Sequence, residues 1–172
     1  MERKELCIIS DSDIPAGSGG INGEGYTYGQ LRHQPIITEI LQRITHPIAR
    51  QMAEDCNKRN SRDGFTMYKV DGEYCFEGLR VGPKVKIPEK DELLALLGDQ
   101  PVNATTIRNI TYTLIRKELA RLYGTSVQEA ADIIGNQLDC APHEDISGYI
   151  FMVPNWAHKW FRHNGYVSRM LK

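Results

Sequence analysis

The chain has 172 residues, of which 41% are hydrophobic and 25% are charged, and its formal net charge is −1 at pH 7. This length and composition predict a soluble globular domain spanning residues 1–172, large enough to bury roughly two-thirds of its unfolded surface without a disulfide or a metal. No run approaches the roughly 20 apolar residues that a membrane span needs, so no membrane partner is expected.

The cysteines and the first residues bear on the compartment. Cys7, Cys56, Cys75 and Cys140 lie far apart and form no CxxC pair, which speaks against a zinc knuckle or ribbon. Met1 to Glu5 are followed by only a short apolar run, so no secretory signal is predicted. We therefore expect a cytoplasmic protein with reduced thiols, in which Cys56 and Cys140 are packing residues.

The first part of the chain predicts a strand, a loop and two helices. Residues 6–9 form a short apolar run and are expected to be a strand. Residues 10–29 form a glycine-rich loop, with five glycines between positions 17 and 25. Apolar residues then recur at helical spacing from Gln30, and a second helix is expected to restart near Pro47.

The clearest local signal is a β-hairpin over residues 65–77. Asp71-Gly72 stands between two arms rich in aromatic and β-branched residues, and this pattern specifies a two-residue turn of the primed type. Residues 81–87 are expected to add a third strand.

The second half predicts three helices, then a strand and a helix. A helix opens at 88–92, and its apolar stretch 93–97 ends at Gly98 to Pro101. A longer helix, capped by Asn103 or Thr105, runs to Gly124, and Ser126 caps the next one. A strand over 149–153 and a helix over 155–163 follow. The expected fold class is α+β: mostly helical, with a small antiparallel sheet built on the 65–77 hairpin and joined by strands 6–9 and 149–153.

The helix over 104–125 is a candidate nucleic-acid interface. It carries four bases and, in Glu118, one acid, and with the preceding helix and turn it is similar to a helix-turn-helix. The alternative is an amphipathic helix with a solvated basic face. The basic and aromatic C-terminal segment 140–172 would extend the same surface. The candidate phosphate-binding residues are Arg108, Arg116, Lys117, Arg121, Lys159 and Arg162.

The C-terminal segment also carries a candidate metal site. His143, Asn155 and His163 occur in this order, with a predicted strand and helix between them. This arrangement resembles the HNH nucleases, whose ββα unit holds a divalent cation and uses a histidine as general base. The resemblance implies His143 and His163 as catalytic or metal-binding residues, Asn155 as the group that orients the base, and Mg²⁺ or Zn²⁺ as cofactor.

Two features of the segment depart from that family. Ala141-Pro142-His143 follows a predicted helix and a proline, whereas the family places its first histidine on a strand. His158 and His163 are five residues apart, which is about 140° around a continuous helix, so the two would not share one ion.

A third arrangement suits a protein partner. Trp156 and Trp160 are four residues apart and therefore lie on one helix face, and the 17–25 loop is a second candidate contact. Three functions thus remain open. The first is a small nucleic-acid-binding or regulatory protein of a phage, a mobile element or a toxin system; the second is a metal-dependent nuclease; the third is a protein-binding inhibitor of a host enzyme.

Overall fold

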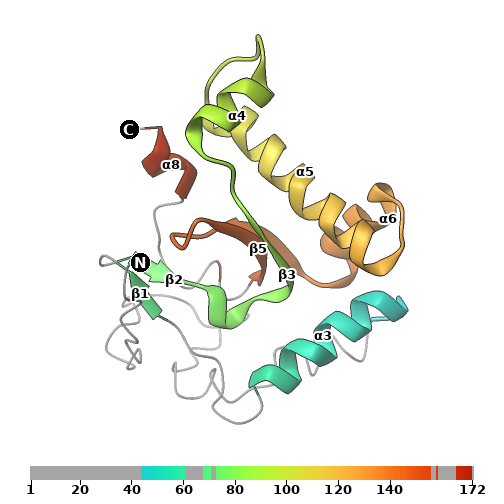
Figure 1. Ribbon diagram of the computed structural model, residues 1–172. Helices are drawn as coiled ribbons and strands as arrows, with labels where there is room; N and C mark the ends of the chain where they lie inside the picture. The colour runs from blue at the N-terminus through green and yellow to red at the C-terminus, as the bar shows by residue number, and fades with distance from the viewer. Residues whose placement is uncertain (1–43, 61–67, 71–72, 156–157, 159–165, 172) are drawn as a thin grey trace.

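The computed structural model describes residues 44–60, 68–70, 73–155, 158 and 166–171 (Figure 1). These residues form an α+β fold, as predicted. The predicted strand 6–9, the glycine-rich loop 10–29 and the helix from Gln30 lie outside the described residues. The elements in chain order are α3 (Pro47–Asn60), β1 (Tyr68–Val70), β2 (Glu73–Cys75), the 3₁₀ turn η3 (Glu77–Leu79), β3 (Val81–Lys86), α4 (Lys90–Leu97), α5 (Ala104–Tyr123), α6 (Val127–Asp132), the π-helical turn η4 (Ile133–Gln137), β4 (Cys140–Glu144), β5 (Tyr149–Pro154) and α8 (Tyr166–Met170).

The predicted hairpin is confirmed. β1 pairs antiparallel with β2, and Val70 faces Glu73 across the Asp71-Gly72 position. This hairpin forms a two-stranded sheet of its own, while the larger sheet is three-stranded and antiparallel, in the order β3-β5-β4. The predicted strands over 81–87 and 149–153 are confirmed as β3 and β5.

Strand β4 was not predicted, and the expectation that residues 141–143 lie off a strand is wrong. Pro142 lies inside β4 and faces Met152 of β5. A proline has no amide to donate, so it is tolerated where one side of a strand has no neighbour. β4 is such an edge strand, and it carries His143 within the sheet.

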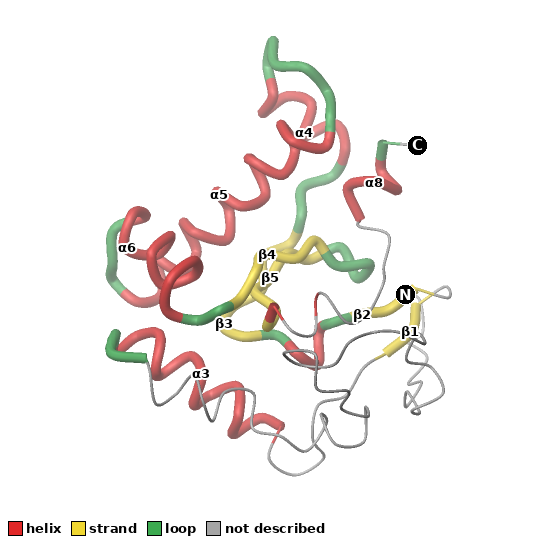
Figure 2. The backbone as a smooth tube through the Cα atoms, turned by 180° about the vertical axis from the view of Figure 1, so that it is seen from behind, coloured by secondary structure: helices red, strands yellow, loops and turns green. Residues whose placement is uncertain are grey.

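The three-stranded sheet has two distinct faces. Residues that pair across antiparallel strands point to the same face, and successive residues alternate. Lys84, Phe151 and His143 therefore share one face. Glu144 lies on the other face, against which α5 packs, as Figures 1 and 2 show from opposite sides.

Side-chain and backbone caps set the limits of α5 and α6. The Asn103 side chain accepts a hydrogen bond from the Thr106 amide, and the Thr106 hydroxyl oxygen accepts one from the Asn103 amide, which forms a capping box. Gly124 ends α5 with φ of 66°, in the left-handed region that glycine adopts without strain. Ser126 caps α6 through the amide of Glu129. All three positions were predicted as helix limits.

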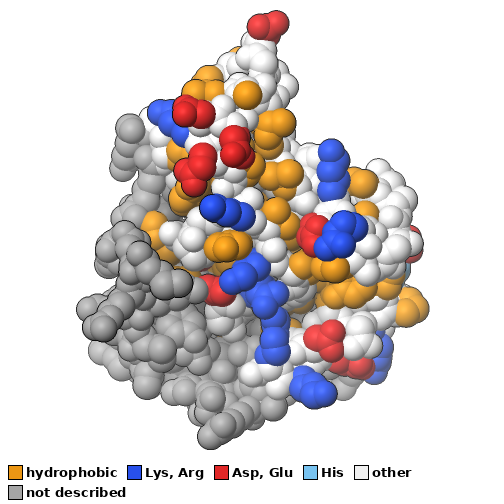
Figure 3. Space-filling model, viewed as in Figure 1, with side chains coloured by type: hydrophobic (Ala, Val, Ile, Leu, Met, Phe, Trp, Pro, Cys, Tyr) orange, Lys and Arg blue, Asp and Glu red, His pale blue; other side chains and the backbone are white. Residues whose placement is uncertain are grey.

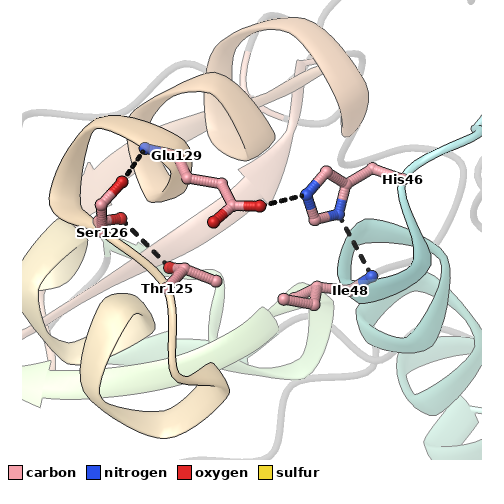
Figure 4. A network of polar contacts seen from close by, with 5 residues as sticks. All are labelled: His46, Ile48, Thr125, Ser126 and Glu129. Atoms are coloured by element: carbon pink, nitrogen blue, oxygen red, sulfur yellow. Dashed lines mark hydrogen bonds and ion pairs between the residues drawn. The ribbon is translucent and has the colours of Figure 1, made fainter.

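A polar network ties α3 to α6 (Figure 4). His46 Nδ1 accepts a hydrogen bond of 3.2 Å from the amide of Ile48 in the first turn of α3. The opposite ring nitrogen, Nε2, lies 3.0 Å from Glu129 Oε1. A nitrogen that accepts carries no proton, so in the neutral ring the proton is on Nε2 and is donated to Glu129.

The core lies around β5, the central strand. Ile150 through Val153 are fully buried on both faces of the sheet. Met52 and Cys56 of α3 are buried with them, on the face of that helix expected from the sequence. Cys56 and Cys140 are buried in the core, as predicted.

Candidate functional site

His143 stands near the end of β4, on the sheet face that α5 does not cover. Its ring lies edge-on to Phe151 of β5, with 5.8 Å between ring centroids. The ring of Phe76, which follows β2, lies 4.6 Å away. His143 is 3% exposed, so the two sheets hold its imidazole between them.

Asp145, just beyond β4, fixes the orientation of His143. Its Oδ1 lies 3.0 Å from His143 Nε2 and accepts the Phe76 amide at 2.8 Å. Its Oδ2 accepts the Ser147 amide at 3.0 Å and the Cys75 thiol at 3.1 Å. The carboxylate is fully buried and is surrounded by donors from both sheets.

These donors keep the carboxyl group of Asp145 ionised. Burial by itself raises its pKa, but the hydrogen bond and charge of His143, with the amides of Phe76 and Ser147, outweigh burial and lower the pKa to about 2. An ionised carboxylate only accepts hydrogen bonds, so Nε2 of His143 carries the proton in this pair. In the neutral ring the lone pair is then on Nδ1.

His158 meets His143 from the helical residues that follow β5. The two rings are 5.4 Å apart between centroids and nearly perpendicular, at 73°. The His158 ring also lies 6.4 Å from that of Phe76, and the residue is partly exposed. Asn155 and His158 are both helical, so an antiparallel strand pair is followed directly by helix, with one histidine from each part.

The structure does not bring Asn155 to His143. The side chain of Asn155 donates to Asp139 Oδ1 at 2.9 Å, and its amide donates to the Asp139 carbonyl at 3.0 Å. Asp139 stands before β4, four residues from His143, and at about 3.3 Å per residue the two ends are about 13 Å apart. Asn155 therefore fixes the far end of the hairpin, and the side chain that contacts the His143 ring nitrogen is that of Asp145.

Of the two predicted imidazoles, His143 meets His158, which was not predicted as its partner, and His163 lies outside the described residues. Among the residues that the structure does describe, no group of three or more His, Cys, Asp and Glu side chains is placed to hold a metal. The 5.4 Å between the His143 and His158 ring centroids, with the two rings nearly perpendicular, is an edge-to-face contact of the two imidazoles.

The predicted basic residues of α5 do not form one face. At about 100° per residue, Lys117 lies about 180° and Arg121 about 220° around the helix from Arg108. Arg121 is paired with Glu118 at 2.6 Å, and Arg108 Nε lies 4.0 Å from the buried Glu144. Arg116 lies at a partly buried position, and the predicted Lys159 and Arg162 lie outside the described residues.

The sequence argument missed Asp145 and Cys75, and it set His158 aside. His143 and Asp145 are two residues apart, which places them on one face of an extended strand. That signal was present in the sequence and needed only the recognition of β4. The contribution of Cys75 had no local signal, because it comes from a hairpin 70 residues earlier in the chain.

Comparison of the chain with protein-family models, with curated proteins and with solved structures finds no match. Within the described part of the chain, every helix is too short or too polar to cross a bilayer. The function therefore has to be inferred from the arrangement of His143, Asp145 and His158.

Proposed function

We propose that this protein is a metal-dependent nuclease of the HNH type, whose catalytic unit is the β4–β5 hairpin with the helical residues that follow it. The observation that carries the proposal is the 5.4 Å approach of the His143 and His158 rings, one from the first strand and one from the helix. A hairpin followed by a helix, with a histidine from each, is the arrangement that the resemblance to the HNH nucleases implies.

His143 would act as the general base. Asp145 holds Nε2 at 3.0 Å and thereby directs Nδ1 to take a proton from water. An adjacent ionised carboxylate also stabilises the imidazolium that forms when the proton arrives. Phe76 and Phe151 pack against the ring and keep it from turning.

His158 would hold the cation. A bound Mg²⁺ or Zn²⁺ stabilises negative charge on the scissile phosphate. His158 is partly exposed while His143 is buried, so the substrate reaches the pair from the side of His158.

The proposal is tested by incubating the purified chain with supercoiled plasmid, single-stranded DNA and RNA, with Mg²⁺, Mn²⁺ or Zn²⁺ and with EDTA. We expect cleavage that EDTA abolishes. His143→Ala should lower kcat at least about a hundredfold, as loss of a general base does. His158→Ala should raise the metal concentration required for half-maximal rate, while His143→Ala leaves that concentration unchanged.

His46→Ala is the matched control, because His46 is also a hydrogen-bonded imidazole but joins α3 to α6. It should cleave like the unaltered protein. Thermal unfolding of each variant separates loss of chemistry from loss of fold. Absence of cleavage with every ion, or full cleavage by a folded His143→Ala protein, would contradict the proposal.

Binding of nucleic acid without catalysis is the second candidate. It is supported by the run of Lys and Arg side chains over β3 in Figure 3, and by the two helices α4 and α5 with a short turn between them, as in a helix-turn-helix. An intact band that is retarded in a gel and released by salt would favour it. Binding of a host enzyme through Trp156, Trp160 and the 17–25 loop involves residues outside the described part, and it would be sought if neither cleavage nor retardation occurs.

We place this activity in the cytoplasm. The thiol of Cys75 donates a hydrogen bond to Asp145 Oδ2. Only the reduced thiol can make that hydrogen bond, and a reducing compartment maintains it.

A further inference from the structure

Strand β3 brings two exposed lysines to the edge of the sheet that carries His143. Lys84 and Lys86 are both exposed, and among the described strands β3 pairs with β5 alone. Figure 3 shows Lys and Arg side chains gathered in a run down this side of the molecule, over β3 and the segment before it.

The register of the sheet aligns these lysines with the candidate base. Lys84 faces Phe151 of β5, and Phe151 faces His143 of β4. The three side chains lie in one row on one face, because paired residues of antiparallel strands point the same way. Two strand spacings separate Lys84 from His143, which is about 10 Å. One strand of a duplex carries a phosphate about every 3.4 Å of axial rise, so the distance from Lys84 to His143 corresponds to roughly three nucleotides.

An aromatic ring lies beside the lysines on the same face. Lys86 faces Tyr149 in the register, and Lys84 Nζ lies 4.6 Å from the centroid of the Tyr149 ring. Tyr149 is partly exposed. Cations that alternate with an aromatic ring suit a nucleic-acid strand, because the cations contact phosphates and a base can stack on the ring.

Two further cations lie close together where β3 begins. Arg59 of α3 donates to the carbonyl of Arg80, the residue before β3. Burial, and then the positive charge of Arg59, lower the pKa of the Arg80 guanidinium. An anion beside this pair would be stabilised, which extends the cationic run along the strand.

Glu77 holds Lys84 in place. Its Oε1 lies 2.6 Å from Lys84 Nζ, and both groups are partly exposed. A phosphate that binds Lys84 has to compete with this carboxylate. Glu77 therefore weakens the attraction of Lys84 for anions. Removal of the negative charge of Glu77 should strengthen that attraction.

We infer that Lys84 and Lys86, with the ring of Tyr149, bind the sugar-phosphate backbone of a nucleic-acid strand beside the phosphate that is cleaved at His143; this inference rests on the proposed nuclease function. The lysines are positioning residues, since they lie one to three nucleotides from the reacting atoms. Edge lysines with Pro83 also keep β3 from pairing with another chain, but that role predicts no dependence of substrate binding on them.

The test measures binding and cleavage separately. Binding of a fluorescent single-stranded DNA is followed by anisotropy in EDTA, over a range of salt concentrations. Lys84→Ala and Lys86→Ala should each weaken binding roughly threefold to tenfold, and each should reduce the salt slope by about 0.7. Glu77→Gln should tighten binding, a gain that loss of a merely structural ion pair would not produce. In cleavage, Lys84→Ala and Lys86→Ala should raise KM by a larger factor than they lower kcat, because the lysines bind the substrate away from the reacting atoms.

Lys117→Ala is the matched control, because Lys117 is an exposed lysine of α5, the helix that covers the opposite face. It should bind and cleave like the unaltered protein. If the protein cleaves but Lys84→Ala and Lys86→Ala bind normally, the inference fails and the proposed function stands. If the protein does not cleave but binds nucleic acid with the expected dependence on Lys84 and Lys86, the proposed function fails and the inferred binding of nucleic acid at these lysines stands. If no nucleic acid binds, both fail.

Discussion

Thr111 and Glu144 are joined by a hydrogen bond of 2.8 Å between two buried side chains that lie 33 residues apart in the chain. Thr111 is in the middle of α5, and Glu144 is the last residue of β4. Glu144 follows His143 directly and points to the opposite face of the sheet. The bond therefore holds α5 on one face of the sheet. His143, the neighbour of Glu144, forms the candidate site on the other face.

Thr111→Val should destabilise the protein. Valine has the shape of threonine but cannot donate, so the buried carboxylate of Glu144 loses a hydrogen-bond donor, at a cost of about 1.5–3 kcal/mol. Thr113→Val on the same helix is the control, since the Thr113 hydroxyl only donates to the Asn109 carbonyl within α5. Urea unfolding should show a change of less than about 1 kcal/mol for the control. Equal losses in the two variants would contradict a special role for Glu144.

Stability should fall in acid because of Asp145. Its pKa in the folded protein is lowered to about 2, whereas the ordinary value is 3.8. A carboxyl group whose pKa is lowered by folding stabilises the protein at pH values above its pKa in the unfolded chain. This stabilisation is lost as the pH falls through its pKa in the folded protein. About 2 kcal/mol should therefore disappear between pH 4 and pH 2. In Asp145→Asn the free energy of unfolding should be lower at pH 5 and should vary less over this range.

The exposed Asp99→Asn provides the control for that pH profile. Its free energy of unfolding should follow the profile of the unaltered protein. The same acid dependence in Asp145→Asn and in the unaltered protein would show that other carboxylates cause it.

Gly82→Ala should cost more than Gly148→Ala. Both glycines have positive φ, 80° and 85°, so alanine is strained at either position by about 1–2 kcal/mol. A Cβ on Gly82 would also press on the terminal methyl of the buried Met52, whereas a Cβ on Gly148 meets nothing within 4 Å. The excess for Gly82→Ala should be about 1 kcal/mol or more in thermal or urea unfolding. In a protein that already carries Met52→Ala, adding Gly82→Ala should cost no more than Gly148→Ala does.

Asn103→Ala should cost about 1 kcal/mol, because the first turn of α5 loses its capping box. Thr105→Ala, two residues on, should change the free energy of unfolding by less than about 0.5 kcal/mol, since position 105 is an exposed surface site. Far-ultraviolet circular dichroism and urea unfolding measure both. A larger loss for Thr105→Ala would show that the helix starts later than Ala104.

The local elements were predictable where the signal lies in neighbouring residues. Asp71-Gly72 marked the β1–β2 hairpin, and Asn103, Gly124 and Ser126 marked the ends of α5 and α6. β4 was missed because Pro142 argues against a strand unless its edge position is known. The basic residues of α5 were predicted as one surface, but the helix turns them in different directions.

The candidate site was predictable only in part. His143 stood out from its spacing to the later histidines, and Asp145 was two residues away. Phe76 and Cys75 come from the first hairpin and reach Asp145 only because the chain folds back across about 70 residues. Lys84 belongs to the same face as His143 because both pair with Phe151, a relation that no spacing in the sequence contains.

The sequence by itself determined the α+β class, the helix limits, the first hairpin and the choice of His143 as a candidate residue, because each depends on backbone preferences or side-chain chemistry within a few residues. The tertiary structure alone decided which imidazole, carboxylate and lysines meet, and that Asn155 does not. The register of the β3-β5-β4 sheet sets these meetings, because one residue of register reverses the face on which every side chain lies.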